Sequence, residues 1–198
     1  MRGILAAMLL ALALGGCAVR PPASEVASGW QPMGAWTVPV APPRWQANGR
    51  VSLRLDDRAA TASIRWHEAD GQYRIELRGA LGAGRLRVAG GPEGVTLTLA
   101  DGEQHSADNP AELVRAVTGY ELPVGFLRWW ITGQPVPWLD GEVRLDRAGR
   151  AVALRQGGWQ VSLGERRMAA GYALPGRVEV SRDGVQVRLA IRDWTVPP

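Results

Sequence analysis

Residues 45–55 read WQANGRVSLRL, and this stretch decides the fold. Apolar or small residues take every second position, which predicts a strand with one dry face and one wet face. The same alternation returns on both sides of Asp70-Gly71 and Asp183-Gly184, pairs that are typical of tight hairpins. The chain is therefore expected to be mainly β, with about eleven short strands in an open antiparallel half-barrel that curves around its apolar side.

Two predicted helices interrupt the alternation in the middle of the chain. The first begins within residues 108–112, DNPAE, which supply a capping side chain, a proline in the first turn and an early acid, and it ends at Gly119. The second covers residues 123–131. Its apolar residues at helical spacing predict a lid over the opening of the sheet, formed by Val124, Phe126, Leu127, Trp129, Trp130 and Ile131. The spacing does not decide which of the two tryptophans faces inward.

The apolar face of such a sheet encloses either a packed core or a ligand cavity, and the pattern alone does not separate the two. A cavity lined only by aliphatic residues and tryptophan suits hydrocarbon. A sixteen-carbon acyl chain gains about 12 kcal/mol on leaving water, at about 0.8 kcal/mol per methylene. Strand parity, which a slip of one residue would reverse, predicts an acyl-chain cavity lined by Val51, Leu53, Ile64, Trp66, Ile75, Leu86, Leu97, Trp159, Val161, Val187 and Leu189.

The start of the chain has the features of a secretory signal. Arg2 supplies a positive charge, residues 4–14 form an unbroken apolar run, and two glycines lead to Cys17, the only cysteine. The run is too short for a spanning helix, which needs about 20 apolar residues. The pattern resembles the bacterial lipobox, so we predict cleavage before Cys17 and lipidation of its thiol; the alternative is an ordinary signal peptide with an incidental cysteine. The predicted organisation is a signal peptide at 1–16, a lipidated cysteine and proline-rich tether at 17–44, and a folded domain at 45–198.

The charge balance is basic. All 23 basic side chains are arginines, and the formal net charge is +4. This favours an anionic membrane surface or an acidic partner, unless the arginines only solvate strand faces. No run of basic residues indicates nucleic-acid binding. Trp30 and Trp36 in the tether are expected to dock on the domain.

No group of residues indicates catalysis. His67 and His105 lie on separate predicted strands, with His67 on the wet face, and a zinc site needs about three or four ligands. Asp56-Asp57 is interpreted as a turn. Neither a nucleophile elbow nor a dinucleotide-binding loop is present. We therefore expect no catalytic residue, no metal site and no cofactor, and we do not expect an enzyme.

Three blocks of sequence indicate a family. The first is residues 113–135, which include LPV at 122–124 and LRWWITGQP at 127–135. The second is the Trp-x-x-x-Gly spacing of residues 45–49, and the third is GALG at 79–82. Over about Trp45 to Trp194 the chain resembles the LolB family of outer-membrane lipoprotein receptors, whose Pro-Leu-Gly loop is similar to GALG with Ala80 in place of proline.

The resemblance implies an eleven-stranded half-barrel with a helical lid, lipid-anchored in the outer membrane and facing the periplasm. It implies that the protein accepts acylated lipoproteins from the periplasmic carrier LolA and inserts them into the outer membrane, without a cofactor and, we expect, as a monomer. Leu81 corresponds to a family leucine implicated in membrane insertion. The alternative is a structural or assembly lipoprotein of the outer membrane with a filled β core.

Overall fold

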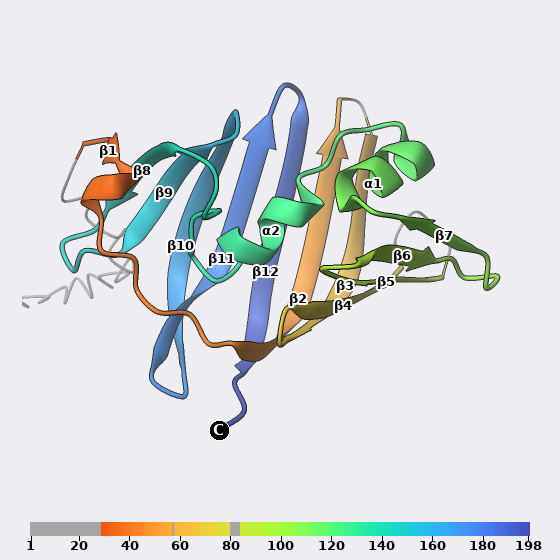
Figure 1. Ribbon diagram of the computed structural model, residues 1–198, viewed down its shortest axis with the longest axis horizontal. Coiled ribbons are helices and arrows are strands. Elements are labelled where there is room, and N and C mark those ends of the chain that lie inside the picture. Colours follow the sequence, from red (N-terminus) through yellow and green to blue (C-terminus); the bar gives the residue numbers. More distant parts are fainter. Residues whose placement is uncertain (1–28, 57, 80–83) are drawn as a thin grey trace, which may run out of the picture.

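One antiparallel sheet forms the body of the protein. The computed structural model describes residues 29–56, 58–79 and 84–198 (Figure 1). Within them, twelve strands lie in the order β1-β8-β9-β10-β11-β12-β2-β3-β4-β5-β6-β7. The sheet is open, with β1 and β7 at its two edges. The predicted open antiparallel half-barrel is thus confirmed, and the described part has a twelfth strand because a short piece of the proline-rich segment pairs with one edge.

The strands form two consecutive runs that meet at the centre of the sheet. The first run contains β2 (Arg44–Leu55), β3 (Arg58–Ala69), β4 (Gln72–Arg78), β5 (Arg85–Gly91), β6 (Gly94–Thr98) and β7 (Gln104–Ala107). The second contains β8 (Gly141–Leu145), β9 (Ala151–Gln156), β10 (Trp159–Ala169), β11 (Tyr172–Arg182) and β12 (Val185–Thr195). The last strand, β12, pairs with the first long strand, β2, so that Leu53 lies opposite Val187. This pairing places the apolar residues of both runs on one face.

A close approach of two strands explains the glycine in the Trp-x-x-x-Gly block. The register of β12 shifts between Ile191 and Asp193, next to the pairing of Ile191 with Gly49. A Cβ atom added at Gly49 would lie 2.1 Å from the carbonyl oxygen of Ala190. Only glycine fits there, because a side chain would force the two central strands apart.

Both predicted helices are present between the two runs. α1 (Pro110–Thr118) begins at Asn109, whose side chain accepts a hydrogen bond of 2.8 Å from the backbone N–H of Ala111, and it ends at Gly119 with a φ of 77°. α2 spans Val124–Trp130. In Figure 1, α2 crosses in front of the central strands and α1 lies beside β6 and β7. The helices therefore cover one face of the sheet, and α2 covers its centre.

The segment before β2 docks on the sheet instead of remaining free. It contains β1 (Gln31–Pro32) and the 3-10 helix η1 (Met33–Ala35). The Trp30 ring stacks under Arg155 at 4.0 Å. Trp36 is buried, and its Nε1 donates a 3.0 Å hydrogen bond to the carbonyl oxygen of Gly149. The expected docking of both tryptophans is thus confirmed, and the domain boundary at residue 45 stays a prediction.

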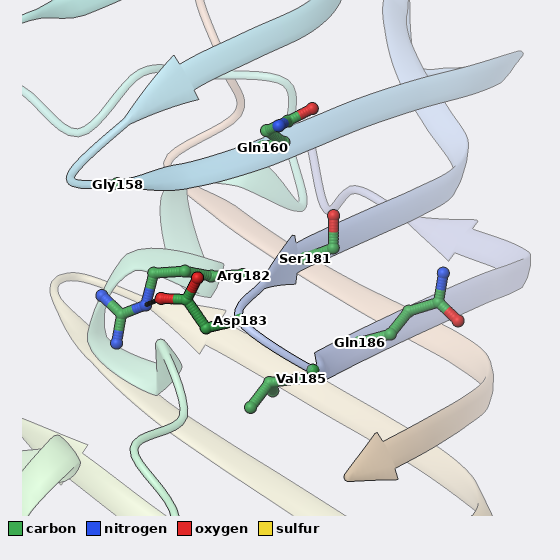
Figure 2. A pocket seen from close by; sticks show the side chains of 8 residues that line it. Gly158, Gln160, Ser181, Arg182, Asp183, Val185 and Gln186 are labelled. Atoms are coloured by element: carbon green, nitrogen blue, oxygen red, sulfur yellow. Dashed lines mark ion pairs between the residues drawn. The ribbon is translucent and has the colours of Figure 1, made fainter. Parts of the chain in front are cut away.

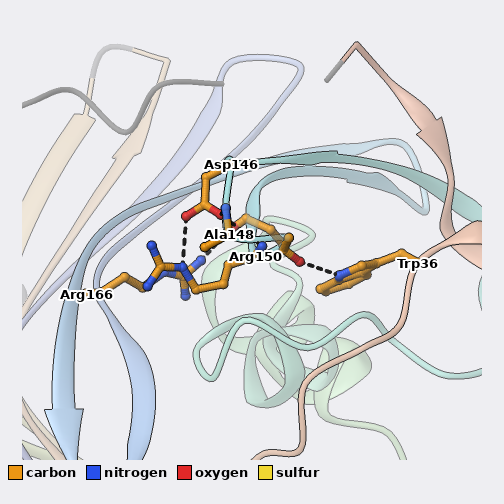
Figure 3. Close-up of polar contacts among 7 residues, drawn as sticks. Trp36, Asp146, Ala148, Arg150 and Arg166 are labelled. Carbon is orange, nitrogen blue, oxygen red and sulfur yellow. Dashed lines mark hydrogen bonds and ion pairs between the residues drawn. The ribbon is translucent and has the colours of Figure 1, made fainter. Parts of the chain in front are cut away.

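A carboxylate organises the turn that receives Trp36 (Figure 3). Asp146 accepts hydrogen bonds from the backbone N–H groups of Ala148 (2.8 Å) and Arg150 (3.0 Å) and from the Arg150 guanidinium (2.9 Å). Burial acts to raise the pKa of Asp146, but these bonds outweigh it and hold that pKa below its ordinary value. The turn between β8 and β9 is therefore a fixed platform for the Trp36 ring.

Candidate functional site

The structure brings the eleven residues predicted for the cavity to the same face of the sheet. Eight of them are buried and three are half-buried. Nine belong to the main apolar cluster, whereas Leu86 and Leu97 belong to a smaller cluster with Val95 and Leu113. The strand-parity prediction of the inner face therefore agrees with the register of the sheet, and their role as acyl-chain contacts stays a prediction.

Helix α2 closes this face with its own apolar side. Leu127, Trp130 and Ile131 are buried, whereas Val124, Phe126 and Trp129 are half-buried. The rings of Phe126 and Trp130 lie 5.5 Å apart. Trp130 is fully buried, while Trp129 packs edge-on against Trp138, whose side chain is 65% exposed. The structure thus identifies Trp130 as the tryptophan that faces inward.

A buried glutamine that the sequence analysis did not single out holds the end of α2. The side-chain oxygen of Gln156 accepts hydrogen bonds from Trp130 Nε1 (3.1 Å) and from the backbone N–H of Val136 (2.9 Å). Its amide group donates to the carbonyl oxygens of Val136 (2.8 Å) and Leu139 (2.7 Å). The sequence could have indicated this inward position, because Gln156 has the same strand parity as Leu154 on β9.

A buried ion pair holds the middle of α2 to the β3–β4 hairpin. Arg128 donates to Glu68, and the same nitrogen lies 3.2 Å from the carbonyl oxygen of Gly71. Glu68 is only 8% exposed, and its burial raises the pKa of its carboxyl group although Arg128 acts to lower it. The Arg128 guanidinium also lies 5.4 Å from the centre of the Tyr73 ring. Glu68 lies two residues after Trp66 on β3 and therefore points to the same inner face. This parity could have identified Glu68 from the sequence, and the sequence analysis did not use it.

Two buried polar atoms at this junction lack partners. Glu68 Oε2 and Trp129 Nε1 make no hydrogen bond within the described part of the chain. An unsatisfied buried polar atom costs about 1–3 kcal/mol. The closed position of α2 is therefore less stable than its apolar packing alone would make it.

Two surface pockets lie away from the inner face. One, of about 360 Å³, is lined by Gln160, Ser181 and Gln186 on the outer side of β10, β11 and β12 and by the turn at Asp183 (Figure 2). The other, of about 60 Å³, lies between Trp36 and Leu174. Neither is lined by the residues predicted for the acyl-chain cavity. On the inner face, α2 packs against the apolar side chains beneath it.

Two predicted site residues, Cys17 and Leu81, lie outside the described residues. His67 is exposed on the outer face of β3, as expected. In residues 29–56, 58–79 and 84–198, no group of three or more histidine, cysteine, aspartate or glutamate side chains could hold a metal ion. None of the helices in these ranges is long and apolar enough to cross a membrane.

The open antiparallel half-barrel with a short helix over its apolar face is a fold that solved structures share. A LolA superfamily protein from Nitrosomonas europaea matches with a TM-score of 0.53 at 7% identity, covering 81% of this chain and 89% of that chain. A putative outer membrane lipoprotein-sorting protein domain from Vibrio parahaemolyticus matches with a TM-score of 0.54 at 13% identity, covering 77% of this chain and 84% of its own.

Sequence comparison then identifies the family. The family described as "Outer membrane lipoprotein LolB" matches residues 43–194. "Outer-membrane lipoprotein LolB" of Alkalilimnicola ehrlichii is 40% identical over 98% of both chains, and that of Halorhodospira halophila is 39% identical over 97% of this chain and 94% of the relative. The chain belongs to the LolB family. It is therefore an outer-membrane lipoprotein of the lipoprotein-localisation pathway, which interacts with a LolA-type carrier and with lipoprotein cargo.

Proposed function

We propose that the inner face of the half-barrel receives the acyl chains of lipoproteins from a LolA-type carrier, and that the protein then passes them to the outer membrane. The observation that carries this proposal is the continuous apolar inner face, which only the seven-residue helix α2 covers at its centre. Acyl chains cannot cross an aqueous compartment uncovered, because each buried methylene is worth about 0.8 kcal/mol.

Entry of the acyl chains requires α2 to move. The helix is too short to be stable alone. Few polar contacts hold it: Arg128 binds Glu68 and the carbonyl oxygen of Gly71, and Trp130 binds Gln156. The unpartnered atoms at this junction favour opening. In the open state, acyl chains replace the lid residues against Leu53, Val187 and the other inner-face residues. Tighter binding than the carrier's draws cargo forward without a nucleotide, and the bilayer is the final acceptor.

We assign membrane anchoring and the insertion of cargo to two residues outside the described ranges. Cys17 carries the lipid anchor, and the residues between it and the docked Trp30 connect the anchor to the domain on the periplasmic side of the membrane. Leu81 lies in the β4–β5 connection and dips into the acyl chains during insertion. Leu81→Glu is expected to leave cargo binding intact and to impair insertion; equal insertion by both proteins would overturn this role.

Transfer from a loaded carrier tests the proposal. The Cys17→Ala form is mixed with a LolA-type carrier that holds a lipidated protein, and the location of the cargo is followed by gel filtration. We expect cargo to move to the Cys17→Ala protein. Cargo that stays on the carrier at every ratio would overturn the proposal and favour a scaffold with a filled core.

A further inference from the structure

The outer face of strands β2 to β5 carries a dense group of arginines. Eight arginines are exposed there, of which Arg44, at the start of β2, is paired with Asp70 in the β3–β4 turn at 2.9 Å. The other seven, which we call the basic face, are Arg50, Arg54, Arg65, Arg74, Arg78, Arg85 and Arg87. The register places Arg50, Ser63, Arg78 and Arg85 in one row across the four strands. Neighbouring strands lie about 4.8 Å apart, so this row spans about 14 Å.

Acidic residues do not balance the basic face. Glu76 is the one carboxylate on the outer side of β2 to β5, and it lies 3.7 Å from Arg78 and 3.9 Å from Arg87. The other five arginines of the basic face make no ion pair within the described part of the chain. The face therefore holds about six uncompensated positive charges in a patch whose width is comparable to a few Debye lengths.

The other half of the sheet is different. Each exposed arginine of β8 to β12 has a carboxylate partner within 3.6 Å. Arg177, for example, lies 3.3 Å from Glu165, and Arg188 lies 2.8 Å from Glu179. The two halves share one fold and one solvent, so general solubility does not explain why only one of them leaves its arginines unpaired.

We propose that the basic face is a docking surface for anionic phospholipid headgroups. Guanidinium groups match phosphate oxygens in geometry and charge, and an arginine near an anionic bilayer contributes about a fivefold gain in binding. If the proposed function holds, a carrier that hands over acyl chains must meet the rim of the inner face, which lies on the opposite side of the sheet. The outer face remains available to the membrane in which the protein is anchored.

Vesicle binding tests this inference without cargo or carrier. The full chain with Cys17→Ala has no acyl anchor, and its apolar run at residues 4–14 is common to every variant. We measure its sedimentation with vesicles of phosphatidylcholine alone and with about 30% phosphatidylglycerol, at low and physiological salt. We expect binding to the anionic vesicles that weakens with salt, and a loss of about 25-fold for Arg78→Gln/Arg85→Gln.

The matched control is Arg177→Gln/Arg188→Gln, which removes the same net charge from the paired half of the same face. We expect less than a threefold loss, and circular dichroism is used to verify folding of both variants. Equal binding to neutral and anionic vesicles, or equal losses in both variants, would overturn the inference. Unchanged vesicle binding with weakened capture of a LolA-type carrier would also overturn it and make the face a protein interface. If the inference fails, transfer of cargo from a LolA-type carrier to the Cys17→Ala protein in solution shows whether the proposed function fails with it.

Discussion

The ion pair between Glu68 and Arg128 is expected to hold α2 closed, and replacing Arg128 by methionine should release it. The side chain of Glu68 is only 10% exposed and that of Arg128 is 25% exposed. Removing one partner of a buried pair leaves the other charge uncompensated, at a cost of about 3 kcal/mol. For a chain of this size the melting temperature should fall by about 6–12 °C.

A double-mutant cycle separates the pair from simple loss of packing. Glu68→Gln keeps an acceptor for Arg128 and should cost about 1 kcal/mol. Arg128→Met/Glu68→Gln leaves no buried charge, so its loss should be smaller than the two single losses together, with a coupling energy of about 2 kcal/mol. Urea unfolding followed by tryptophan fluorescence measures all three variants. Arg44→Met, which breaks the exposed 2.9 Å pair with Asp70, is the control and should cost less than about 1 kcal/mol.

The pH dependence of stability in the same variants shows whether the charge of Glu68 stabilises or destabilises the folded protein. The pKa of Glu68 is raised in the folded protein, so its carboxylate costs stability at neutral pH. This cost fades as the pH falls through the raised pKa toward the ordinary value of 4.5. Without Arg128, the raising effect of burial on the pKa of Glu68 is opposed less, and the Arg128→Met protein should regain stability relative to wild type as the pH falls from 7 toward 4.5. An Arg128→Met protein within about 0.5 kcal/mol of wild type, or additive losses in the cycle, would refute the reasoning.

Three further changes test other parts of the structure. Gln156→Leu orphans Trp130 Nε1 and three backbone groups and should cost about 3 kcal/mol in urea unfolding; a loss below about 1 kcal/mol would contradict this. Asp146→Ala should cost about 2 kcal/mol at pH 7. Because the pKa of Asp146 is lowered in the folded protein, the carboxylate contributes its stability above pH 3.8, and this contribution is lost as the pH falls through the lower folded pKa. A loss of stability in the variant that persists unchanged in acid would contradict this role of Asp146. Gly125→Ala meets open space in α2 and should stabilise the closed helix by about 0.5–1 kcal/mol and slow cargo uptake; faster uptake would argue against opening of α2.

Strand parity was sufficient to predict the inner face, because each side of a strand meets either the core or solvent. Capping signals also placed the start of α1 in residues 108–112 and its end at Gly119, since caps are local features. The pairing of β12 with β2 joins residues that are far apart in sequence, and no local pattern encodes it. The four hydrogen bonds of Gln156 come from α2 and the loop after it, so its role emerges only when these elements are placed together.

The packing of α2 on the inner face was beyond sequence reasoning for a related reason. The same leucine and valine residues can pack against a lid or line a cavity, depending on where α2 lies. Trp129 and Trp130 are neighbours with equal hydrophobicity, and only the rotation of α2 makes Trp130 fully buried and leaves Trp129 against Trp138. A second conformation of one short helix would therefore change the interior without changing the sheet.

Site-specific photo-cross-linking tests most directly whether acyl chains occupy the inner face. A benzophenone side chain is placed at Leu53, on the inner side of β2, or at Ser52, its neighbour on the outer side. Each Cys17→Ala protein is mixed with a LolA-type carrier that holds a lipoprotein with labelled acyl chains. We predict cross-links to the acyl chains at residue 53 and not at residue 52. Equal labelling at both positions, or labelling only at residue 52, would contradict it.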